Sequence, residues 1–96
     1  MDSNGYNKSI LNTHPGLCFL CGQRCETARH EIYPGATRKI CKRMGLWINV
    51  CPSCHSRIHA GGAEWLKEYT ERAFLEQGGT MEEWMDRKNG IGKNYL

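Results

Sequence analysis

Residues 51–59 read CPSCHSRIH, and this stretch limits what the chain can fold around. Cys51 and Cys54 have the C-x-x-C spacing of a metal-binding pair. Pro52 stands where a helix can begin, because the first turn does not need its missing N–H. On that helix His55 and His59 share one face, whereas Cys54 points about 100° away. We therefore predict that the start of one helix serves two metal sites.

A second cysteine pair, Cys18 and Cys21, lies upstream with the same spacing. Four thiolates suit a closed tetrahedral zinc site. Free buried thiols are the alternative, but paired C-x-x-C motifs are a specific metal signal. Six cysteines in 96 residues can also form a disulfide framework. Because residues 1–13 carry no apolar signal segment, we expect a reducing cytoplasmic setting, where cysteines more often hold metal.

His30 lies between the two cysteine pairs and, with His55 and His59, offers three imidazoles. Three histidines leave open coordination positions of the kind that catalytic metals need. Taken singly, each histidine also fits a hydrogen-bonded or exposed position without a ligand. The combination favours a second divalent ion. A zinc protease is disfavoured, because Ser56 stands where its H-E-x-x-H motif requires glutamate.

The remaining cysteines and one histidine receive no ligand role. Cys25 and Cys41 are interpreted as small buried or partly exposed thiols. His14 precedes a proline in a predicted turn and is assigned nothing.

The chain divides into three parts of one α+β domain. Residues 1–14 read as a flexible or loosely docked tail, 15–62 as the metal-binding core and 63–96 as a helical extension. Strands are predicted at 29–33 and 46–50, while 37–43 is either a loop or a short helix. A helix at 63–77 carries an apolar stripe interpreted as core packing, and Thr80 with Glu83 predicts a capping box. The stripe consists of Trp65, Leu66, Tyr69, Ala73 and Phe74.

Basic residues gather in the metal-binding half, although the net charge is only +3. Between residues 23 and 57 there are seven basic and two acidic side chains. This distribution fits a polyanionic partner and fits a solvated basic surface equally well. No apolar run approaches membrane-spanning length, so we expect a soluble protein with no membrane partner. The candidate nucleic-acid contacts are Arg29, Arg38, Lys39, Lys42, Arg43 and Arg57.

Three motifs carry a family resemblance: RHEIYxG at 29–35, GLW at 45–47 and CxxCHxxxH at 51–59. Together with the first cysteine pair, they resemble the HNH endonuclease superfamily in its zinc-containing treble-clef form. The chain is also similar to small HNH-like proteins of bacteriophages and prophages, which tend to end in a helical segment and a tail like GKNY at 92–95. The resemblance implies a ββα-metal fold braced by a four-cysteine zinc. It makes His30, His55 and His59 the ligands of a catalytic ion.

The implied activity is metal-dependent hydrolysis of DNA phosphodiester bonds, with Mg²⁺, Mn²⁺, Ni²⁺ or Zn²⁺ as the second metal. Glu31 stands where the family places its general-base histidine, so it is expected to orient or deprotonate the attacking water. Leu46 corresponds to the family's middle asparagine. The implied partners are DNA and phage packaging or replication proteins, in the cytoplasm of a bacterial host. The alternative is a non-catalytic zinc module that binds nucleic acid or protein.

Overall fold

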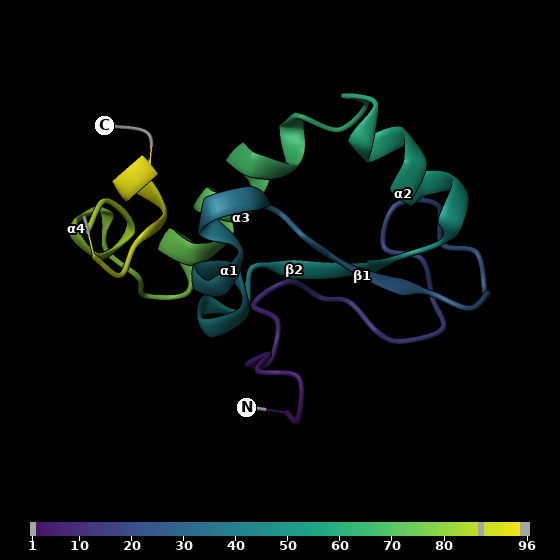
Figure 1. Cartoon of the computed structure of the whole chain (residues 1–96), viewed down its shortest axis with the longest axis horizontal. Helices are drawn as coiled ribbons and strands as arrows, with labels where there is room; N and C mark the ends of the chain where they lie inside the picture. The colour runs from purple at the N-terminus through teal and green to yellow at the C-terminus, as the bar shows by residue number, and fades with distance from the viewer. Residues whose placement is uncertain (1, 87, 95–96) are drawn as a thin grey trace.

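A two-stranded antiparallel sheet connects the parts of the chain that carry the candidate ligands (Figure 1). The computed structural model describes residues 2–86 and 88–94. Strand β1 (Ala28–Glu31) pairs with β2 (Trp47–Val50), with His30 opposite Ile48. The helices are η1 (Gly35–Thr37), α1 (Arg38–Met44), α2 (Pro52–His59), α3 (Trp65–Glu76), α4 (Met81–Trp84) and η2 (Ile91–Asn94). The predicted α+β class is therefore confirmed.

The segment left open as loop or helix forms α1 between the two strands. Lys42 and Arg43 lie in its last turn, where positive charge is favourable at a helix C-terminus. Gly45 ends the helix in the left-handed conformation with φ 72°, and its N–H donates to the Cys41 carbonyl. The first strand is shorter than predicted and ends at Glu31, and beyond it the Tyr33 N–H donates to Cys41 Sγ at 3.4 Å instead of to β2.

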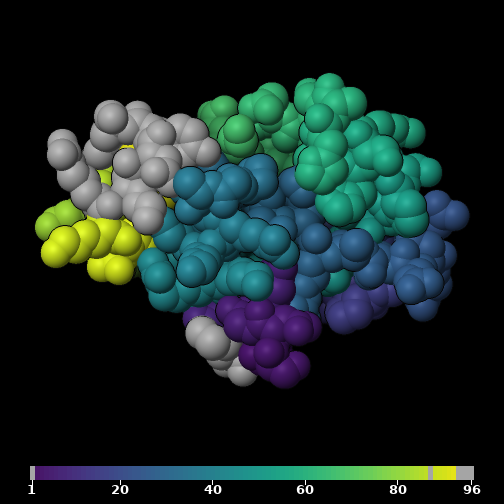
Figure 2. All heavy atoms as spheres, viewed as in Figure 1, coloured from purple at the N-terminus to yellow at the C-terminus, as the bar shows by residue number. Residues whose placement is uncertain are grey.

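Residues 2–14 pack against the sheet, more closely than the flexible or loosely docked tail expected from their composition. Tyr6 and Leu11 are buried. The N–H of Ile10 donates to the Gly45 carbonyl at 2.9 Å, and the Trp47 indole N–H donates to the Asn7 carbonyl at 2.8 Å. In Figure 1 this purple segment passes below the strands, and Figure 2 shows it against the atoms of α1. These contacts use main-chain carbonyl groups, so no pattern of side chains in the sequence predicts that this segment docks on the sheet.

One hydrophobic core joins the three parts of the chain. Leu11 from the N-terminal segment packs in the same cluster as Ile48 of β2, Leu66 of α3 and Ile91 of η2. All four residues of β2 are buried, because the N-terminal segment covers one face of the strand and helices cover the other. Tyr95 of the tail motif lies outside the described residues.

Helix α3 buries part of the predicted stripe, because Leu66, Ala73 and Phe74 pack in or against the core. Leu66 and Thr70, four residues apart, point into the core. Trp65 and Tyr69 lie one residue earlier on the helix and are exposed by 52% and 47%, so the prediction that they pack in the core is wrong. Phe74 does pack inward, against Trp84, with ring centroids 5.1 Å apart.

The predicted capping box at the start of α4 is confirmed. Thr80 Oγ1 accepts from the Glu83 N–H at 3.0 Å, and Glu83 Oε1 accepts from the Thr80 N–H at 3.0 Å. This pair starts the helix that places Trp84 in the core. Within residues 2–86 and 88–94, no helix combines the length and apolarity needed to cross a bilayer.

Gly45 is a point where the fold tolerates no side chain. A Cβ there would overlap the Lys8 carbonyl, and the residue has positive φ. We expect Gly45→Ala to lower the free energy of unfolding by about 3 kcal/mol, because strained backbone and steric overlap add. Urea titration of the zinc-saturated protein measures this change.

Gly61→Ala is the matched control, because Gly61 also has positive φ but nothing lies within 4 Å of its added Cβ. In that variant the free energy of unfolding should fall only by the cost of the strained backbone, about 1 kcal/mol. Equal losses in the two variants would show that residues 8–10 are not docked against Gly45.

Candidate metal centres

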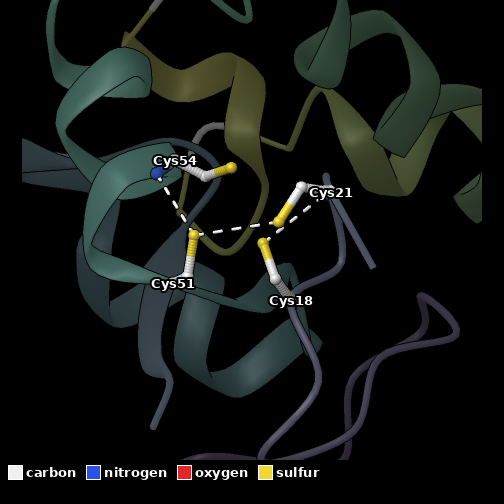
Figure 3. Close-up of side chains that lie close together, drawn as sticks. All are labelled: Cys18, Cys21, Cys51 and Cys54. Atoms are coloured by element: carbon white, nitrogen blue, oxygen red, sulfur yellow. Dashed lines mark hydrogen bonds between the residues drawn. The ribbon is translucent and has the colours of Figure 1, made fainter. Parts of the chain in front are cut away.

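Four cysteine side chains from two separate segments point toward one another (Figure 3). Cys18 and Cys21 lie in the loop before β1, Cys51 follows β2, and Cys54 lies in the first turn of α2. Their sulfur atoms all lie within 4.8 Å of one another, and Cys21 Sγ is 3.9 Å from Cys51 Sγ. Two sulfurs bound tetrahedrally to zinc at about 2.3 Å lie about 3.8 Å apart. The cluster therefore fits zinc as predicted.

Each cysteine pair also supplies a backbone donor to its own first sulfur. The Cys21 N–H donates to Cys18 Sγ at 3.5 Å, and the Cys54 N–H donates to Cys51 Sγ at 3.4 Å. Gly22, with φ 74°, allows the first of these turns. Such N–H groups stabilise thiolate charge, which zinc ligands carry. These hydrogen bonds therefore arrange the two cysteine pairs as ligands without the help of an ion.

The thiol pKa values show how the cluster distributes negative charge. Desolvation opposes ionisation of Cys18, but backbone N–H groups, led by those of Cys21 and Cys51, lower its pKa to about 6. Burial and the neighbouring sulfurs of Cys51 and Cys18 raise the pKa of Cys54 to about 12. Ionisation of one thiol therefore makes ionisation of a second thiol less favourable. A cation held by all four sulfurs removes this repulsion.

Three histidines form a second cluster on the α2 side of the sheet. His30 comes from β1 and is 5% exposed, while His55 and His59 lie on one face of α2. His55 Nε2 is 3.1 Å from His59 Nε2, and the three residues each offer a ring nitrogen within 4.8 Å of the others. Two nitrogens at 2.0 to 2.1 Å from one ion lie about 2.8 to 3.4 Å apart, from octahedral to tetrahedral geometry. The cluster can therefore bind a divalent ion.

His30 and His55 are held in the neutral form, which is the form that ligates metal. Burial, together with the charges of His55 and His59, lowers the pKa of His30 to about 4. Burial and His59 also lower the pKa of His55. The negative charge of Glu31 acts to raise the pKa of both histidines, so the field of its carboxylate reaches the cluster.

The two clusters differ in how many ligands the protein supplies. Four thiolates complete the coordination of a tetrahedral zinc, whereas three imidazoles leave positions for water or substrate. A cavity of about 160 Å³ lies directly against His30 and His59. Adjacent residues Cys54 and His55 belong to different clusters, which confirms the geometry predicted for the start of α2.

Glu31, the expected base, points to the opposite face of β1 from His30, as strand alternation requires. Its Oε1 accepts from the Tyr6 hydroxyl and, at 2.9 Å, from Arg38 Nε. Desolvation raises the pKa of Glu31, but these hydrogen bonds outweigh it and hold the pKa below its usual value. Leu46, at the position of the family's asparagine, is fully buried in the core.

Arg29 is partly exposed and is held in place by the N-terminal segment. Its Nη2 pairs with Asp2 Oδ2 at 2.7 Å, and its guanidinium lies 4.3 Å from the Tyr6 ring centroid and 4.9 Å from that of Trp47. Cation–π contact and the ion pair together fix this side chain. Arg29 is therefore a structural residue of the N-terminal docking surface as well as a candidate phosphate contact.

The other candidate nucleic-acid residues divide into two groups. Three make contacts within the chain: Arg38 with Glu31, Lys42 Nζ with the Asn4 carbonyl at 3.1 Å, and Arg43 Nη2 with the Asn89 carbonyl at 3.0 Å. Lys39 and Arg57 are exposed on α1 and α2. The six side chains therefore do not form a single basic patch that is free to bind nucleic acid.

Residues assigned no ligand role lie outside both clusters. Cys41 is fully buried, its Sγ donates to the Tyr33 carbonyl at 3.2 Å, and burial raises its pKa to about 12. Cys25 is partly exposed, and His14 Nε2 is 3.1 Å from Asn12 Oδ1. Sequence reasoning missed Tyr6, which lies 25 positions from Glu31 and carries no motif.

No protein-family model, curated protein or solved structure matches this chain. The functional assignment therefore depends on the two clusters and their surroundings.

Proposed function

We propose that the chain is a metal-dependent DNA endonuclease of the HNH type, built as a zinc-braced treble-clef domain with a ββα-metal site. The observation that carries this proposal is the convergence of His30, His55 and His59 beside a separate four-sulfur cluster. The antiparallel pair β1–β2 followed by α2 is the arrangement that such a site requires. The resemblance of residues 18–59 to the HNH superfamily supplies the reaction class.

In this proposal the cysteines and histidines have separate tasks. Cys18 and Cys21 hold the loop before β1 against Cys51 and Cys54, and so fix the start of α2. His30, His55 and His59 hold the second divalent ion in a rigid frame. A divalent ion bound there supplies positive charge that offsets negative charge developing on the phosphate oxygens. A reducing bacterial cytoplasm keeps the thiols free to bind zinc.

Glu31 is proposed to accept the proton of the attacking water after a rotamer change at the end of β1, which its position on the opposite face of the strand from His30 requires. Its hydrogen bonds to the Tyr6 hydroxyl and to Arg38 Nε both use Oε1. Its lowered pKa makes it a weak base, so its contribution lies at the low end of general-base effects.

We expect Glu31→Gln to reduce plasmid cleavage about 100-fold while metal content stays the same. The glutamine side chain keeps the shape of the glutamate but cannot accept the proton. Tyr6→Phe is the matched control, because it removes a donor to Oε1 and leaves the carboxylate in place. Its cleavage rate should equal or exceed that of the wild type. Full activity in Glu31→Gln would show that another group activates the water.

DNA contacts in this proposal are mainly to phosphates. Lys39 and Arg57 are exposed and able to reach the backbone of a duplex, whereas Arg29 contributes only if Asp2 is displaced. Binding should therefore be weakly sequence-specific and sensitive to salt. Phage packaging or replication proteins are further partners that the resemblance implies.

A non-catalytic zinc module is the second candidate function. The observation that favours it is that Glu31 and four of the six candidate DNA-binding side chains already contact other residues of the chain. Such a module would bind nucleic acid or a protein partner through the same fold.

Incubation with supercoiled plasmid in Mg²⁺, Mn²⁺, Ni²⁺ or Zn²⁺ separates the two functions. The endonuclease predicts conversion to nicked or linear DNA in at least one metal, together with a second, exchangeable ion per chain. The binding module predicts one tightly held zinc and no cleavage in any metal.

A further inference from the structure

A small cavity lies between the histidine cluster and the start of α3. Its volume is about 160 Å³, and its walls include the metal-site residues His30 and His59 on one side and Glu64 and Lys67 on the other. Sites for drug-sized ligands occupy about 300 to 1,000 Å³, so this cavity suits a compact group such as a phosphate. His55 does not line it. A group in the cavity therefore approaches the cluster from the side of His30 and His59.

The position of Lys67 beside this cavity is fixed by its backbone. The Lys67 carbonyl accepts from the Tyr33 hydroxyl at 2.6 Å, and Tyr33 is itself buried. The preceding residue, Leu66, is 2% exposed and anchors the same turn in the core. The Lys67 side chain is 41% exposed, so its ammonium group remains accessible to a ligand.

Among residues 2–86 and 88–94, the ion-pair partner of the Lys67 ammonium group is a weak one. Its Nζ lies 3.5 Å from Glu64 Oε2, and the Glu64 side chain is 74% exposed. Exposed pairs of this kind are easily exchanged for a better anion.

We propose that Lys67 binds the phosphate group of the substrate in this cavity and positions it against His30 and His59. Glu64 pairs with the ammonium group when no phosphate is bound. The identity of the phosphate as part of a DNA strand rests on the proposed function, whereas binding of a compact phosphodiester anion does not. Lys67 acts through charge and hydrogen bonds and takes no part in proton transfer.

Dimethyl phosphate is the probe that tests this assignment, because it contains one phosphodiester and no base. Amide chemical shifts of the zinc-loaded protein, followed during titration, give an apparent Kd for each variant. We expect Lys67→Ala to weaken binding about tenfold and Lys67→Arg to stay within about threefold of the wild type. Glu64→Gln should tighten binding about threefold, because the competing carboxylate is gone.

Arg72→Ala is the matched control. Arg72 lies on the same helix and pairs with Glu68 at 3.3 Å, so its removal changes the charge of α3 equally, away from the cavity. It should leave the apparent Kd within about twofold of the wild type. If the Lys67–Glu64 pair were merely structural, Lys67→Ala and Glu64→Gln would shift the Kd in the same direction.

The outcome also separates this assignment from the endonuclease. Opposite shifts in Lys67→Ala and Glu64→Gln support phosphate binding by Lys67 even if no plasmid is cleaved in any metal. A wild type that does not bind dimethyl phosphate, or a Lys67→Ala Kd equal to that of Arg72→Ala, overturns it. If the wild type cleaves plasmid in that case, the endonuclease stands and another residue holds the phosphate.

Discussion

Replacement of His59 by alanine is expected to abolish plasmid cleavage, by at least about a thousandfold, and to remove the exchangeable metal. His59 supplies one of three imidazoles, and His55 with His30 cannot alone define an open three-ligand site. Because His59 is exposed on α2, its loss should cost little stability. The assay is conversion of supercoiled plasmid, with metal content measured after dialysis.

The control for this variant is His14→Ala. His14 contacts Asn12 and lies outside the histidine cluster, so its removal changes the histidine count without changing the site. Cleavage and metal content should match the wild type. A His59→Ala protein that cleaved as fast as His14→Ala would exclude the histidine cluster as the catalytic centre.

Cys54→Ser is expected to lose the tightly held zinc and, with it, the cooperative unfolding transition. Cys54 is 5% exposed and joins α2 to the loop that carries Cys18 and Cys21. Structural zinc sites contribute about 10 to 16 kcal/mol of apparent binding free energy, whereas small domains have a net stability of about 5 to 15 kcal/mol. Loss of the site therefore removes most of what keeps the domain folded. Elemental analysis and thermal unfolding measure the two effects.

Cys25→Ser provides the comparison, because Cys25 is a partly exposed thiol outside the four-sulfur cluster. It should retain one zinc and a melting temperature within a few degrees of the wild type, about 5 °C at most. Full zinc content and unchanged melting in Cys54→Ser would show that the four sulfurs do not hold a structural ion.

The cysteine and histidine clusters were predictable because their residues lie in short motifs with fixed local geometry. Helical periodicity alone separates Cys54 from His55 and His59, and the structure keeps that separation. The capping box at Thr80 is equally local. Features that depend on only three or four neighbouring residues could therefore be predicted from the sequence.

Contacts between distant segments could not be predicted in this way. Periodicity groups Trp65, Leu66 and Tyr69 in one stripe of α3, but it does not say that Leu66 faces the core while Trp65 and Tyr69 are exposed. The hydrogen bond from Tyr6 to Glu31 spans 25 positions and follows no motif. Only the assembled fold reveals these contacts.

If both clusters bind an ion as proposed, the adjacency of Cys54 and His55 on one short helix would link the two metal equilibria. Because both sites need the same placement of α2, an ion in one site reduces the ordering that the other ion must impose. Thermodynamic linkage then requires that each ion raise the affinity for the other by the same factor. A chelator that first strips the weaker, three-histidine site therefore also loosens the zinc. Metal titrations of this protein should be fitted as two coupled events.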